Sequence, residues 1–128
     1  MRVLLDTHTL YWWLADRPEL SAPARKLISR TGNTILVSAA STWEIAIKAR
    51  LGKLPIPLNF VGDLEGLLSL EGFEPLAISV EHSVRAGLLP GPHQDPFDRM
   101  LVAQAQAENI PIVSKDVVFD AYGVRRLW

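Results

Sequence analysis

Short apolar runs alternate along the chain with longer segments in which apolar residues recur at helical spacing. The short runs are typical of buried strands and occupy residues 2–6, 34–38, 75–80 and 111–114. The helical pattern covers residues 9–15, 23–29, 43–51, 60–70, 80–88 and 97–108. This alternation favours an α/β fold, a three-layer sandwich with a central, mainly parallel sheet flanked by helices.

The length and composition predict one domain over residues 1–128. The chain has 128 residues, of which 48% are hydrophobic, enough for one continuous core. Gly52 can end a helix, and the Leu-Pro-Ile-Pro segment at 54–57 prevents that helix from continuing. We interpret this segment as a connection rather than a domain boundary.

Charge and cysteine content exclude several classes of protein. Thirteen basic and 14 acidic residues leave a net charge of -1, so any contact with nucleic acid needs a local basic patch. The absence of cysteine excludes disulfides, thiol catalysis and thiolate metal sites. The N-terminal apolar run, broken at Asp6, is too short for a membrane span and lacks a signal-peptide pattern. We expect a cytoplasmic protein with no membrane partner.

Acidic residues follow the predicted strands, mostly at their C-terminal ends. Asp6 closes the first strand, Glu44 lies shortly after the second, and Ser114 and Asp116 follow the last. Asp98 begins the helix that leads into that last strand. Because ligands gather beyond the carboxyl ends of parallel strands, we expect these side chains to meet at one edge of the sheet.

Four carboxylates at one edge repel one another unless a cation lies between them. Oxygen ligands without cysteine suit Mg²⁺ or Mn²⁺. Asp6 carries most weight, because a carboxylate directly after a buried run must face a crevice or be paired. The pattern therefore predicts a divalent metal site.

Each acid also has a purely structural interpretation. Ser41 and Glu44 have the spacing of a helix-capping box. Asp95 is a candidate N-cap before Pro96, and Asp98 is either a first-turn carboxylate or a functional one. Asp116 lies in a turn that tolerates a surface carboxylate, so it argues for a site only together with the other acids.

Four sequence blocks resemble one known family. They are LLDTH at 4–8, SAASTWEIAIK at 38–48, HQDPFDRMLVAQA at 93–105 and VSKD at 113–116. In this order they resemble the PIN-domain ribonucleases, most of all the VapC-type toxins of toxin–antitoxin pairs. The resemblance implies an α/β fold, an acidic pocket for Mg²⁺ or Mn²⁺, endonucleolytic cleavage of RNA, a small antitoxin as partner, and commonly a homodimer.

The resemblance also assigns roles by position. The family's four acids match Asp6, Glu44, Asp98 and Asp116. Asp6, Asp98 and Asp116 are expected to hold the metal, while Glu44 binds a second ion, holds a metal-bound water or accepts its proton. Ser114 matches a small hydroxyl position, and Thr7 and Asp95 are expected to support the site.

The surrounding basic and aromatic residues carry weaker predictions. Arg99, Lys115, Lys48 and the Arg50/Lys53 pair are candidate RNA contacts, although Lys48 has the spacing of an ordinary ion pair with Glu44. No histidine lies beside an acid in a relay-like pattern, so we propose none of His8, His82 and His93 as a general base. Trp12 and Trp13 point about 100° apart on a helix, so one is expected in the core and the other at a protein interface or against a base.

Two other classes of protein fit less well. A phosphate-accepting receiver domain shares the length and parallel sheet, but it needs paired acids after the first strand, where Asp6 stands alone. A catalytically silent PIN-fold binding module is signalled by loss of a metal carboxylate, and all four are present.

Overall fold

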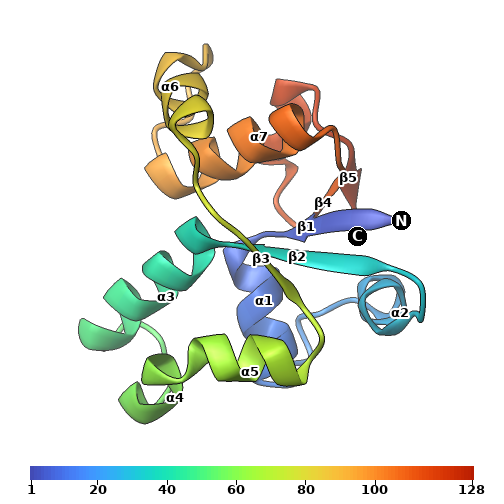
Figure 1. Ribbon diagram of the computed structural model, residues 1–128, viewed down its shortest axis with the longest axis vertical. Coiled ribbons are helices and arrows are strands. Elements are labelled where there is room, and N and C mark those ends of the chain that lie inside the picture. Colours follow the sequence, from blue (N-terminus) through green and yellow to red (C-terminus); the bar gives the residue numbers. More distant parts are fainter.

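The central feature of the protein is a five-stranded parallel sheet with strand order β3-β2-β1-β4-β5 (Figure 1). The structure is a computed structural model that describes residues 1–128. The strands are β1 (Arg2–Leu5), β2 (Thr34–Ser38), β3 (Glu74–Leu76), β4 (Ile112–Val113) and β5 (Arg126–Leu127). Leu5 of β1 pairs with Val37 on one side and Val113 on the other. This central position explains the uninterrupted apolar run of β1.

Helices cover both faces of the sheet. They are α1 (Thr7–Leu14), α2 (Ala22–Ser29), α3 (Ala39–Arg50), α4 (Leu58–Gly62), α5 (Leu64–Leu70), α6 (Val80–Leu88), α7 (Pro96–Glu108) and the 3₁₀ helix η1 (Val117–Tyr122). Val3 and Leu5 point into a core shared with α1, α2, α3 and α5, whereas Leu4 points into a second core shared with α7 and η1. Because successive strand residues face opposite sides, one strand supplies both cores. The predicted three-layer α/β sandwich is confirmed.

Several predicted boundaries are wrong. The predicted helix 60–70 is divided at Asp63, whose backbone (φ -115°, ψ 24°) departs from helical values. The predicted strand 75–80 ends early because Ser79 begins α6, where its hydroxyl accepts a hydrogen bond from the backbone N–H of His82. Gly52 ends α3 with a positive φ of 71°, as predicted.

None of the helices combines the length and the hydrophobicity needed to cross a bilayer.

Candidate active site

Asp6 lies at the carboxyl end of the central strand and begins α1. Its Oδ1 accepts a hydrogen bond from the backbone N–H of Thr9 at 2.8 Å, and its Oδ2 accepts one from the Ser114 hydroxyl. Only 5% of the residue is exposed, and this burial raises the pKa of Asp6, while the hydrogen bonds from Ser114 and Thr9 lower it in part. Asp6 is therefore both a helix cap and a desolvated carboxylate.

Asp116 reaches the same place from the adjacent strand. β4 lies beside β1 in parallel, so the residues after the two strands meet at one edge of the sheet. The backbone N–H of Asp116 donates to the Ser114 hydroxyl at 2.9 Å, and its own Oδ1 accepts from Val118 at the start of η1. Asp6 and Asp116 line one cleft of about 280 Å³, as the sequence led us to expect of neighbouring strand ends.

Glu44 is buried on the inner side of α3, with 4% of the residue exposed. Its Oε2 accepts from Lys48 Nζ at 2.6 Å, which confirms the predicted ion pair. The alternative capping box is wrong, because α3 begins at Ala39 and its N-cap is Ser38. Glu44 is thus free of any capping role.

Asp98 lies in the first turn of α7, where Asp95 is the N-cap. Asp95 Oδ1 accepts from the backbone N–H groups of Phe97 and Asp98, so the division of roles predicted for the two acids is confirmed for Asp95. Asp98 instead pairs with His93, with 2.8 Å between Oδ2 and the histidine Nε2. Burial raises the pKa of Asp98 to about 6; the His93 hydrogen bond lowers it, and the nearby charges of Asp95 and Glu44 raise it.

Sequence reasoning missed His93. It precedes Asp98 by five residues, but the turn at Asp95 and Pro96 brings its ring back against the carboxylate. Its position in the same sequence block as Asp95 and Asp98 could have indicated that it lies near them. His93 orients one oxygen of Asp98 and leaves the other free.

Arg99, a predicted RNA contact, makes hydrogen bonds within the protein. Its guanidinium donates to the carbonyl oxygens of His93, at 3.0 Å, and of Leu89. Arg99 therefore anchors the loop that carries His93, and these hydrogen bonds compete with any phosphate contact. Lys48 is likewise engaged with Glu44, and of the predicted basic contacts only Lys115 lines the acidic cleft.

The acids form two pairs rather than one compact cluster. Asp6 and Asp116 share the cleft, while the charge of Glu44 acts on Asp98. Thr7, the residue after Asp6, joins α1 to the helix that carries Glu44, since its buried hydroxyl donates to Ser41 Oγ of α3 at 3.1 Å. No three Asp, Glu or His side chains lie close enough in this structure to share one metal ion.

The donor set nevertheless fits a hard divalent cation in its chemistry. All four acids offer oxygen, and burial raises the pKa of both Asp6 and Asp98. An ionised carboxylate in such surroundings lacks solvation that a nearby cation supplies. The fit of the site to a divalent cation therefore rests on the desolvation of its carboxylates.

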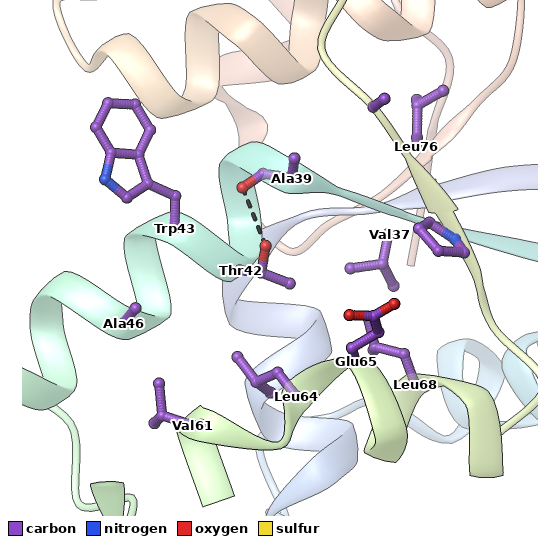
Figure 2. Close-up of a pocket in the computed structure, with 13 residues that line it drawn as sticks. Val37, Ala39, Thr42, Trp43, Ala46, Val61, Leu64, Glu65, Leu68 and Leu76 are labelled. Carbon is purple, nitrogen blue, oxygen red and sulfur yellow. Dashed lines mark hydrogen bonds between the residues drawn. The ribbon is translucent and has the colours of Figure 1, made fainter.

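A larger cavity of about 530 Å³ lies apart from these acids, between α3, α5 and β3 (Figure 2). Its walls are mostly apolar and include Val37, Leu64 and Leu68, with Glu65 as the one carboxylate. None of the four candidate acids lines it, so size alone does not identify the chemical site.

A family model described as PIN domain matches residues 3–124. The chain belongs to the PIN-domain family. Ribonuclease VapC22 from Mycobacterium tuberculosis (strain ATCC 25618 / H37Rv) is 30% identical over 115 residues, which cover 89% of this chain and 86% of that protein.

Solved structures share the PIN-domain fold. VapBC2 from Rickettsia felis, bound to a DNA fragment from its promoter, superposes with a TM-score of 0.73 at 19% identity, over 99% of this chain and 98% of that one. Mycobacterium tuberculosis VapC20, a toxin that cleaves the sarcin–ricin loop, has a TM-score of 0.65 at 14% identity and 95% coverage of both chains. At these identities the likeness supports the PIN-domain fold.

Proposed function

We propose that this PIN domain is a metal-dependent endoribonuclease, the toxin of a toxin–antitoxin pair. The observation that carries the proposal is the pairing of Asp6, buried at the end of the central strand, with Asp116 in one cleft. Family membership and the VapC-type relatives support the same activity. A toxin that cleaves cellular RNA acts in the cytoplasm, which is the location we propose.

Because no three acids converge in this structure, Mg²⁺ or Mn²⁺ would be held by one or two carboxylates from among Asp6, Asp98 and Asp116, with water as the remaining ligands. A bound divalent ion would supply a hydroxide nucleophile at neutral pH and neutralise phosphate charge. Ser114 holds one oxygen of Asp6 through its hydroxyl, and His93 holds one oxygen of Asp98. Both carboxylates are thereby fixed in orientation, which is how outer partners tune metal ligands.

Glu44 differs from the other three acids in its pairing with a lysine. It is buried, its charge acts on Asp98, and Lys48 keeps it paired at 2.6 Å. We propose that Glu44 holds a water or accepts its proton during cleavage. Lys48 then positions Glu44 and has no direct contact with phosphate.

Cleavage of a mixed RNA pool tests the activity. The purified chain is incubated with labelled transfer, ribosomal and messenger RNA in Mg²⁺, in Mn²⁺ or in chelator. Asp6→Asn keeps an oxygen for the Thr9 N–H while removing the charge, so we expect cleavage to fall at least about a hundredfold. Asp63→Asn, at an exposed carboxylate, is the matched control and should cleave normally.

Other outcomes separate the alternatives. Cleavage that persists in chelator or in Asp6→Asn contradicts the acidic site. A folded chain that cleaves no RNA in either metal supports the silent binding module instead.

The partners we propose are a small antitoxin and a second copy of this chain. Co-expression with the product of an adjacent small open reading frame should suppress cleavage and yield a stable complex. Light scattering of the isolated chain should give the mass of a dimer, and a monomer mass would contradict that part of the proposal.

A further inference from the structure

The two adjacent tryptophans of α1 have different surroundings. Trp13 packs against Phe73, with ring centroids 6.0 Å apart, and its indole N–H donates to Glu71 at 3.1 Å. Trp12 turns away from that contact and lines the cleft that contains Asp6 and Asp116. Both tryptophans pack against the first core, but only Trp12 also lines the cleft.

Trp12 forms an aromatic wall with His8, which lies one helical turn earlier. The ring centroids of His8 and Trp12 are 5.6 Å apart. Trp128 packs against Trp12 from another direction, with ring centroids 5.9 Å apart and an angle of 59° between the ring planes. His8 is exposed and Trp12 is half-buried, so part of the wall faces solvent. Packing against Trp128 limits the movement of Trp12 and keeps the wall in place.

The remaining side chain of the cleft is Lys115. It is exposed and belongs to none of the ion pairs of the chain. The cleft therefore combines aromatic faces, one uncommitted cation and the two acids Asp6 and Asp116.

We propose that this cleft is a subsite for one unpaired nucleotide of RNA next to the cleaved phosphate. This inference rests on the ribonuclease function proposed above. The base stacks on the His8–Trp12 wall, because every base presents a π-face to an aromatic side chain. Lys115 contacts a phosphate of the same strand.

The size of the cleft and its uncommitted lysine suit a single nucleotide. Its volume of about 280 Å³ is near the lower end of ligand pockets, about 300 Å³, and suits one nucleotide rather than a duplex. Lys115 attracts a phosphate, whereas Asp6 and Asp116 repel one unless the divalent ion that they are proposed to hold is present, so binding is measured in Mg²⁺. A strand bound here passes directly beside Asp6 and Asp116.

The test measures RNA binding separately from cleavage. An Asp98→Asn background keeps the RNA intact, and Asp98 does not line the cleft. Binding of a labelled mixed-sequence single-stranded RNA in Mg²⁺ is followed by fluorescence anisotropy. Trp12→Ala should raise Kd about tenfold, whereas Trp12→Phe should retain most of the affinity because it keeps an aromatic face.

The same substitutions in the active chain should raise KM more than they lower kcat. Phe60→Ala is the control, because Phe60 is an exposed aromatic residue outside the cleft, and it should change neither Kd nor KM. Lys115→Gln, at an exposed position that folding does not require, should reduce the slope of log Kd against log salt by about 0.7.

Two results would overturn the subsite. One is an unchanged affinity for RNA: folded Trp12→Ala and Lys115→Gln both bind RNA as tightly as the parent, while the parent chain is active. The other is a Trp12→Ala chain that binds RNA normally but no longer binds its antitoxin, which would make the wall a protein surface. A parent chain that neither cleaves nor binds RNA contradicts the proposed function itself. That result differs from failure of the subsite alone, in which the parent chain still cleaves RNA.

Discussion

Replacing Asp98 by asparagine should make the metal-free protein more stable at neutral pH while it abolishes cleavage. The Asp98 side chain is only 21% exposed, and its pKa rises from 3.8 to about 6 on folding. Asparagine keeps an oxygen that accepts the His93 hydrogen bond, so the substitution removes the charge with little change of shape. The gain in stability then measures the cost of burying the ionised carboxylate.

The sign of the pH dependence follows from the raised pKa. Between pH 4 and 6 the folded Asp98 keeps its proton while the unfolded one has lost it, so the free energy of unfolding of the parent falls as pH rises. At about 1.4 kcal/mol per pKa unit, reduced for partial exposure to solvent, the cost at pH 7 is about 1–3 kcal/mol. Asp98→Asn should recover that amount at pH 7 and almost none at pH 4.

Urea unfolding at both pH values, in chelator, is the assay. Asp63→Asn, which changes an exposed carboxylate, controls for the change in net charge and should leave stability unaltered. Added Mg²⁺ should then stabilise the parent much more than Asp98→Asn, because a ligand that binds only the folded state raises its stability. An equal gain at pH 4 and pH 7, or no gain at pH 7, would refute the assignment of a buried charge.

Substitutions at His93 and at Lys48 test the residues that orient the acids. His93→Phe removes the hydrogen bond to Asp98, so the affinity for Mn²⁺, measured by titration calorimetry, should fall about tenfold. His93→Gln should have an intermediate affinity. An unchanged affinity in His93→Phe would exclude a positioning role for His93. Lys48→Met leaves the buried Glu44 without its partner and should lower the free energy of unfolding in urea at pH 7 by about 1–3 kcal/mol. Adding Glu44→Gln should restore most of that loss, and a double variant no more stable than Lys48→Met would contradict the pairing.

The sequence by itself determined the alternation of strands and helices and the ends at which the acids lie. Strand and helix patterns are local, because hydrophobic spacing and capping residues act within a few positions of the chain. The burial of β1 and the capping role of Asp95 were both predictable on these grounds. The short segments β5 and η1 were not predicted, since two to six residues carry too little periodicity to recognise.

Only the tertiary structure decided which side chains meet. Ser114 reaches Asp6 across 108 residues because β4 docks beside β1, and no local signal predicts that hydrogen bond. The pairing of His93 with Asp98 depends on a loop whose course Arg99 fixes through backbone carbonyls. Contacts of this kind come from packing between elements, so a sequence can mark the acids of a site while their partners, burial and pKa values emerge only in the folded chain.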